Sequence, residues 1–112
     1  MTGIPASHIA ISALTALDRK LDVTANNVAN VNTDEFKKSR ALLQTQDVPG
    51  VSVTITGVDT PGTMQPNGVE SSNVDLTEEF AELIITQHSQ TANIRVIETE
   101  EEMQESLLDI FA

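Results

Sequence analysis

The sequence predicts a mainly α protein whose long N- and C-terminal helices pack as a coiled coil, with a short β-hairpin and loop inserted between them. Three observations predict this arrangement. Apolar residues repeat at heptad spacing near the N-terminus, a capped apolar stripe fills the C-terminus, and the segment between them alternates apolar and polar residues. The 112 residues suit one small domain, organised as segments 1–40, 41–74 and 75–112.

The N-terminal segment predicts a helix from about Ala6 to Asn32, and Pro5 lies just before it, where proline is tolerated. Five apolar residues follow one another at intervals of 3, 4, 7 and 3 positions, as in a heptad repeat, and Thr24 occupies the position that the longest interval skips. These residues are Leu14, Leu17, Leu21, Val28 and Val31.

The middle segment predicts a short hairpin followed by a linker. The alternating sequence VSVTITG at 51–57 indicates a strand, and VPGV at 48–51 favours a turn before it. Leu42 and Leu43 mark a preceding strand. The sequence TPGTMQPNG at 60–68 gathers proline and glycine and predicts a loop.

The C-terminal segment predicts a helix that begins after Asp75 and continues to about Phe111. Asp75 is a natural N-cap, and Glu78 three residues later makes a capping-box pattern. This helix of about 36 residues would be about 54 Å long, against about 27 residues in the first helix. Part of its apolar stripe therefore lacks a partner within the chain, which predicts assembly with further copies. The predicted assembly seam combines the five N-terminal residues with Leu76, Phe80, Leu83, Ile94, Ile97, Leu107 and Leu108.

The composition and charge exclude several kinds of partner. There is no cysteine, so disulfides and thiolate metal sites are excluded. Residues 1–40 hold five Lys or Arg against four acids, whereas residues 41–112 hold one Arg against thirteen acids. Such acidity argues against nucleic acid and anionic membranes, and it serves either as a solvated face or to steer unlike ends of neighbouring subunits together. No apolar run reaches the roughly 20 residues that membrane insertion needs, and MTGIPASHIA shows no cleaved secretory signal.

Four asparagines crowd the end of the first predicted helix. Asn26, Asn27, Asn30 and Asn32 lie within seven residues, although asparagine is about 0.5–0.7 kcal/mol worse than alanine inside a helix. Their side chains both donate and accept hydrogen bonds, and asparagine tolerates left-handed backbone angles. The residues alone leave two explanations open: a local helix cap, or contacts with the backbone of the insert or of a neighbouring subunit.

Two long stretches of the chain resemble the terminal motifs of the bacterial flagellar basal-body rod family, which contains the rod and hook axial proteins. Residues 12–40, SALTALDRKLDVTANNVANVNTDEFKKSR, carry an Ala/Leu-rich helix, Asn-rich turns, and then an aromatic residue with lysine. Residues 72–110, SNVDLTEEFAELIITQHSQTANIRVIETEEEMQESLLDI, are similar to the C-terminal rod motif. The two motifs lie at opposite ends in the expected order and cover 68 of the 112 residues.

The resemblance implies a structural rod subunit, of a short type with little outer domain. Family members pack their terminal helices into a coiled-coil core and stack around a central channel as the drive shaft for motility. The implied partners are copies of the chain, other flagellar axial proteins and the flagellar type III export apparatus. The implied location is the basal-body rod that crosses the periplasm, reached by export without a cleaved signal peptide. Turn or lattice contacts are implied for Asn26, Asn27, Asn30, Asn32, Thr33, Phe36, Asn73, Asp75, Gln87 and Asn93.

Two positions depart from the family pattern. Glu35 stands where the family usually has glycine, just before the aromatic Phe36. Because a positive φ strains glutamate, we expect the bend to shift to Asn32 or Asp34. Gln90 stands where an aromatic residue is usual, so the middle of the seam is polar, which can specify register at a cost in stability.

Catalytic and ligand-binding patterns are weak in this sequence. The only histidines, His8 and His88, lie far apart, and Ser71 and Ser72 lack the partners of a catalytic triad. The loop at 60–68 lacks the lysine ending of a phosphate-binding loop. We therefore predict no enzyme, metal site or cofactor. The alternative function is a small acidic helical adaptor or export-chaperone-like protein, which would be stably folded in dilute solution, whereas rod helices would order on assembly.

Overall fold

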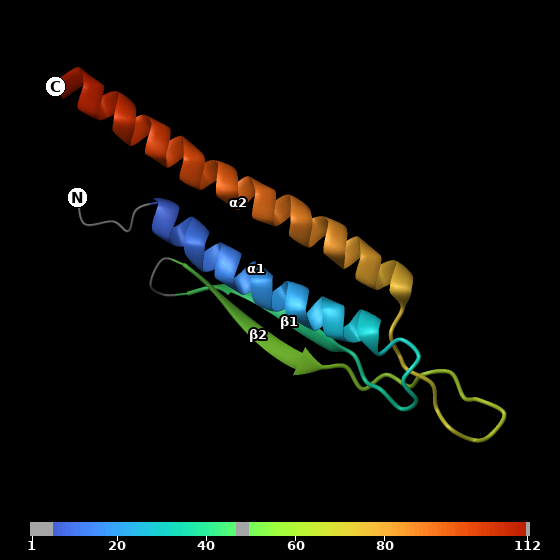
Figure 1. Cartoon of the computed structure of the whole chain (residues 1–112). Coiled ribbons are helices and arrows are strands. Elements are labelled where there is room, and N and C mark those ends of the chain that lie inside the picture. The colour runs from blue at the N-terminus through green and yellow to red at the C-terminus, as the bar shows by residue number, and fades with distance from the viewer. Residues whose placement is uncertain (1–5, 47–49, 112) are drawn as a thin grey trace.

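The computed structural model describes residues 6–46 and 50–111, and within them it contains two helices that flank two strands (Figure 1). Helix α1 spans Ala6–Ala29, strand β1 spans Ser39–Thr45, strand β2 spans Val51–Gly57 and helix α2 spans Leu76–Phe111. The predicted fold class, mainly α with a β insert, is confirmed. Pro5 and the first two residues of the predicted turn at 48–51 lie outside the described residues.

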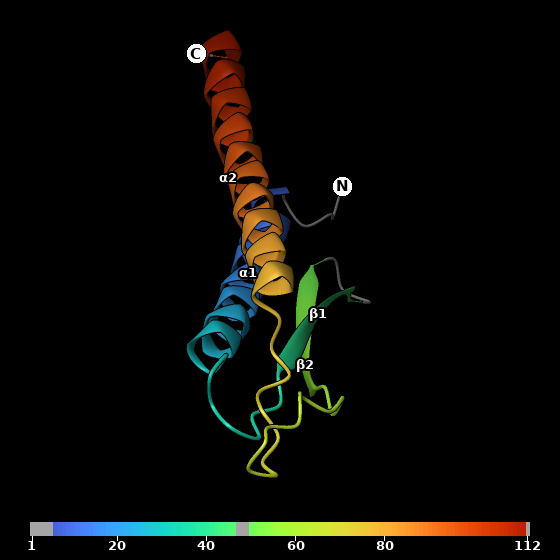
Figure 2. The same cartoon turned by 90° about the vertical axis from the view of Figure 1, so that its right-hand side faces the viewer.

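Helix α1 is the middle layer of the molecule. It packs against α2, which runs antiparallel to it, and against both strands of the hairpin (Figures 1 and 2). The whole chain measures 74 × 25 × 13 Å. In the described part of the chain, the buried apolar side chains are Ala10, Ala16 and Leu17, all on α1. The two alanines let neighbouring elements approach closely, but three side chains make a very small core.

The hairpin is antiparallel and packs one face on α1. Its register runs from the pair Ser39 and Gly57 to the pair Thr45 and Val51, so both predicted strands are present. Ser12 of α1 fixes the start of β2, because its hydroxyl accepts a hydrogen bond from the Val51 amide at 3.0 Å. The same hydroxyl donates to the Ile9 carbonyl at 2.9 Å.

The predicted loop at 60–68 folds back on the segment that follows it. The amide of Ser71 donates to the Thr63 carbonyl at 2.8 Å, and the amide of Gln65 donates to the Val69 carbonyl at 2.9 Å. Gly62 is required in this loop, because a Cβ at that position would lie 1.9 Å from the Ser71 carbonyl oxygen. This close approach brings the chain back toward the start of α2.

Helix α2 begins with the predicted cap. The Asp75 carboxylate accepts a hydrogen bond from the Thr77 amide at 3.0 Å. The second half of the predicted capping box is replaced by longer-range contacts, because the Glu78 carboxylate reaches Lys38 and Arg40 instead. The start of α2 is therefore tied to the segment that enters β1.

Helix α1 ends earlier than expected and turns at a different residue. The last turn tightens, since the amides of Asn30 and Val31 donate to carbonyls three residues back at 3.1 and 3.2 Å. The positive φ lies at Glu35, with a value of 62°, and the expected shift of the bend to Asn32 or Asp34 is wrong. The Glu35 amide donates to the Glu70 carbonyl at 2.8 Å, so a tertiary contact holds the strained angle in place.

Candidate functional site, a polar junction and an exposed helix surface

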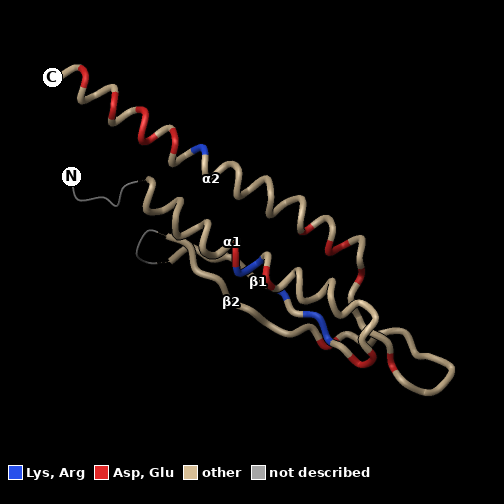
Figure 3. Tube along the Cα trace, viewed as in Figure 1, with Lys and Arg blue, Asp and Glu red and all other residues tan. Residues whose placement is uncertain are grey.

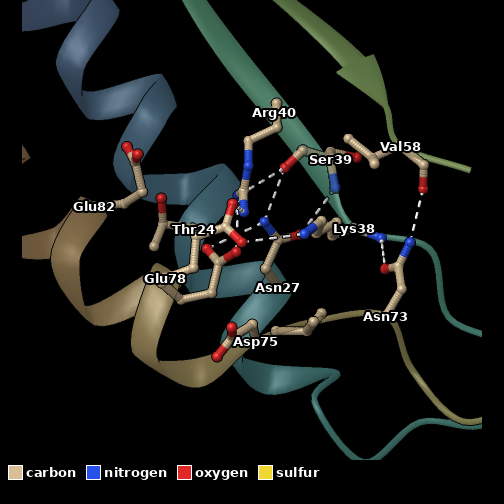
Figure 4. A network of polar contacts seen from close by, with 12 residues as sticks. Thr24, Asn27, Lys38, Ser39, Arg40, Val58, Asn73, Asp75, Glu78 and Glu82 are labelled. Atoms are coloured by element: carbon tan, nitrogen blue, oxygen red, sulfur yellow. Dashed lines mark hydrogen bonds and ion pairs between the residues drawn. The ribbon is translucent and has the colours of Figure 1, made fainter. Parts of the chain in front are cut away.

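The end of α1, the start of β1 and the start of α2 meet in a cluster of polar side chains, which we call the polar junction (Figure 4). Long side chains from all three elements converge there and bind one another or nearby backbone groups. Its members are Asn27, Lys38, Ser39, Arg40, Asn73, Glu78 and Glu79.

Asn27 is the centre of the polar junction and is completely buried. Its side-chain oxygen accepts a hydrogen bond from the Ser39 amide at 3.0 Å, and its side-chain nitrogen donates to the Ser39 carbonyl at 2.9 Å. The amide therefore pairs with the first residue of β1 as a neighbouring strand would. The same nitrogen donates to Glu79 Oε2 at 3.3 Å, which links α1 to α2.

Arg40 pairs with both glutamates of the polar junction. Its Nη1 lies 2.7 Å from Glu79 Oε1, and its Nη2 pairs with Glu78. Lys38 Nζ lies 3.3 Å from Glu78 Oε2. Glu79 is completely buried, and Arg40 is the cation that faces its carboxylate.

The ionisation of these groups follows from the pairing. Burial by itself would lower the pKa of Arg40, but the two glutamates raise it above its ordinary value. The hydrogen bond from Arg40 lowers the pKa of Glu78 against the opposing effect of burial, and Lys38 lowers it further. Arg40 and Glu78 are therefore both charged near neutral pH.

Asn73 ties the linker to the same place. Its side-chain oxygen accepts a hydrogen bond from the Lys38 amide at 2.7 Å, and its side-chain nitrogen donates to the carbonyls of Val58 and Thr60, both at 2.9 Å. The segments before β1, after β2 and before α2 are therefore held by one side chain.

The other residues implied as turn or lattice contacts do not gather in one place. Asn30 donates to the Asn26 carbonyl at 2.8 Å, and its oxygen accepts from the Thr33 hydroxyl at 2.9 Å. Asn93 donates to the Ser89 carbonyl within α2. Among the remaining members, Phe36 is half-buried, while Asn26, Asn32 and Gln87 are exposed.

Sequence reasoning did not find the ion pair of Arg40 with Glu79. No spacing rule links a strand residue to a helix residue that follows a long insert. The run of acids at the start of α2 was the available signal, and it does not say which of its members is buried.

Polar contacts also set the register of α1 against α2. From the junction toward the far end, Lys20 Nζ lies 2.9 Å from Glu82 Oε2, and Gln90 Nε2 donates to Asp18 Oδ1 at 3.0 Å. Near the start of α1 the Ser7 amide donates to the Glu100 carboxylate. The predicted polar position at Gln90 thus has a polar partner across the helix pair.

The chain covers only part of the predicted assembly seam. Leu17 is buried, and five members are half-buried: Leu14, Val28, Val31, Leu83 and Ile97. The remaining six are exposed: Leu21, Leu76, Phe80, Ile94, Leu107 and Leu108. Most of the exposed members lie on α2, and all residues from 101 to 111 are exposed.

Charge is distributed unevenly along α2 (Figure 3). Its three acids nearest the polar junction each lie against Lys or Arg. The stretch 83–94 has no Lys, Arg, Asp or Glu, and the stretch 95–111 holds Arg95 with six acids. The two ends of one helix therefore present different surfaces.

The described residues offer no group of His, Cys, Asp and Glu side chains that could hold a metal ion. Neither helix, over the part that the structure describes, is long and apolar enough to cross a membrane. The fold and surfaces are those of an elongated helical structural protein.

Comparison with known proteins identifies the family. A family model described as "Flagella basal body rod protein" matches residues 8–37, and one described as "Flagellar basal body rod FlgEFG protein C-terminal" matches residues 65–110. Together they cover about two thirds of the chain. The chain belongs to the flagellar rod and hook protein family, as its terminal motifs indicated.

Two relatives show how much is shared. The flagellar hook protein FlgE of Caulobacter vibrioides is 43% identical over 49 residues, which are 44% of this chain and 8% of the relative. The flagellar basal-body rod protein FlgG of Buchnera aphidicola subsp. Baizongia pistaciae is 49% identical over 41 residues, which are 37% of this chain and 16% of the relative. The chain thus matches only a small part of the length of these relatives.

Proposed function

We propose that this chain is a structural subunit of the flagellar basal-body rod, which polymerises through its terminal helices into the drive shaft for motility. Its partners are copies of itself and other flagellar axial proteins, and the flagellar type III apparatus exports it to the rod that crosses the periplasm. It works without a catalytic site or cofactor. A flagellar axial structural role is common to the family, and the proposal adds polymerisation and position.

The observation that carries the proposal is the apolar surface that α2 leaves uncovered. Eleven large apolar side chains of this helix are exposed, while the whole described chain buries three apolar residues. Exposed apolar surface of this extent marks a site of contact with a partner. A set of residues that follows a helical repeat fits helices of other subunits better than a small ligand.

The seam residues and the asparagines have separate parts in this proposal. The exposed seam residues pack against helices of neighbouring subunits. Asn27 and Asn73 hold the turn between helix and insert, so the surface presented to neighbours has one shape. Asn26, Asn32 and Gln87, which are exposed, are free to contact the lattice.

Leu21→Asp tests assembly through the helix pair. The side chain is exposed, so we expect the variant to keep its helix content by circular dichroism. If position 21 becomes buried between subunits, the aspartate would be a buried charge without a partner, and rod assembly and swimming would be abolished. Leu42→Asp, on the exposed outer face of the hairpin, is the matched control and should support swimming. Normal swimming of the Leu21 variant would contradict the proposal.

The position of a labelled copy in purified basal bodies gives an independent measurement. We expect the label in the rod. A chain that is absent from basal bodies, and that stays a fully helical monomer in light scattering at every concentration, would instead support the adaptor function.

A further inference from the structure

Helix α2 presents two separate apolar surfaces. The first, which we call the base stripe, consists of Leu76, Phe80 and Ile84, which are spaced four residues apart on one helix face and are exposed. The second, which we call the tip groove, lies near the other end of the helix. It joins two hollows of about 340 and 380 Å³ that share Thr99 and Met103. Its lining includes Ala6, Val96, Thr99, Met103, Leu107 and Ile110.

The tip groove continues past the start of α1. The contact of the Ser7 amide with Glu100 places the first turn of α1 beside that residue, and Ala6 is part of the groove wall. The eleven residues after Glu100 extend for about 16 Å beyond this point. This end of α2 therefore projects past the described start of α1 (Figure 1).

Charge decides which surface fits the tip groove. Six acids and one arginine occupy 95–111, and two copies of this end placed side by side would repel each other. The base stripe carries much less unpaired charge. Glu78, Glu79 and Glu82 are paired with Lys or Arg, Asp75 caps the helix, and the next twelve residues, 83–94, are uncharged. Pairing unlike ends thus buries both apolar surfaces without bringing the acidic ends together.

We propose that the tip groove of one copy receives the base stripe of a second copy, with Phe80 as the anchor. This inference rests on the proposed function and names the contact within it. Phe80 is 52% exposed in the single chain, and methionine in the groove adapts to an aromatic ring. Because the two surfaces differ, a copy that binds a partner through one of them still has the other free. The contact therefore extends into an open filament instead of closing a dimer.

Disulfide cross-linking tests this contact, since the chain has no cysteine of its own. The full chain carrying both Ile84→Cys and Met103→Cys keeps the Phe80 anchor, and it is oxidised in concentrated solution and in purified basal bodies. We expect a ladder of multimers, with at least about tenfold more cross-linked product than the control that carries Leu42→Cys and Met103→Cys. Leu42 is 57% exposed and Ile84 is 56% exposed, but Leu42 lies on the hairpin.

The single variants distinguish unlike ends from like ends. Ile84→Cys alone and Met103→Cys alone should each stay monomeric on oxidation, and an equal mixture of the two should give dimers that grow no further. Dimers from Met103→Cys alone, or no ladder from the double variant in either sample, would overturn the inference. A labelled chain that enters basal bodies without forming the ladder would overturn this contact and leave the proposed function intact.

Discussion

The two ends of helix α2 carry acids that do opposite things. At the start, Glu78, Glu79 and Glu82 all lie against Lys or Arg from α1 or β1. At the far end, six acids surround an exposed apolar surface. The paired acids hold this chain in one conformation, whereas the unpaired acids at the far end limit which surfaces can bind there.

Burial explains why the first end matters more for stability. Glu79 and Asn27 have no exposed surface, so a lost partner leaves a polar group without water to replace it. The acids of the far end are solvated, and salt screens them. Substitutions near the polar junction should therefore lower the free energy of unfolding more than substitutions at the far end of α2.

Glu79→Ala should have the largest effect. The change removes a buried carboxylate from Arg40 and Asn27, and we expect the free energy of unfolding to fall by about 3 kcal/mol. Urea unfolding followed by circular dichroism measures it. Glu102→Ala at the far end is the matched control, with an expected change within about 0.5 kcal/mol. Equal losses of unfolding free energy in the two variants would show that the paired acids are no more important for stability than the acids of the far end.

Asn27→Ala should cost about 2 kcal/mol, because the amide and carbonyl of Ser39 both lose their partner. The neighbouring Asn26→Ala provides the control, since Asn26 is exposed and alanine favours the helix by a few tenths of a kcal/mol. Thermal unfolding of the two variants would separate them clearly. A less stable Asn26 variant beside an unchanged Asn27 variant would rule out the buried amide as the link.

Acid should weaken the polar junction by a smaller amount. The folded pKa of Glu78 lies below its ordinary value because of Arg40 and then Lys38. The stability it contributes is present above the ordinary pKa and is lost as pH falls through the lower folded pKa. Because Glu78 is substantially exposed, we expect less than about 1 kcal/mol. Unfolding curves from about pH 7 to pH 3 measure this, and Glu78→Gln should flatten that part of the profile.

Glu35→Gly should have the smallest effect and the opposite sign. Glycine adopts the φ of 62° without strain, so we expect a gain of about 0.5 kcal/mol after the greater freedom of the unfolded chain is counted. Asp34→Gly is the control and should lose stability, since it brings the same freedom without relieving strain and also removes the hydrogen bond that Asp34 accepts from Gln65. A loss in both variants would mean that Glu35 is not strained.

Local patterns predicted the elements well where the cause is local. Asp75 caps α2 because its side chain reaches an amide two residues away, and no distant residue is needed. The alternation at 51–57 became β2 for the same reason. The positive φ at Glu35 was not predicted, because the contact between its amide and the Glu70 carbonyl outweighs the local preference of glutamate for a negative φ.

Local patterns in the sequence are enough to predict two long helices, a hairpin and the family. Heptad spacing, alternation and caps depend on neighbours a few positions away, and motifs can be read directly. The joint burial of Asn27 and Glu79, and the two apolar surfaces that α2 leaves exposed at opposite ends, follow from tertiary packing. Those facts depend on how the insert and the loop return the chain to α1, and that path is set by contacts between residues far apart in the sequence.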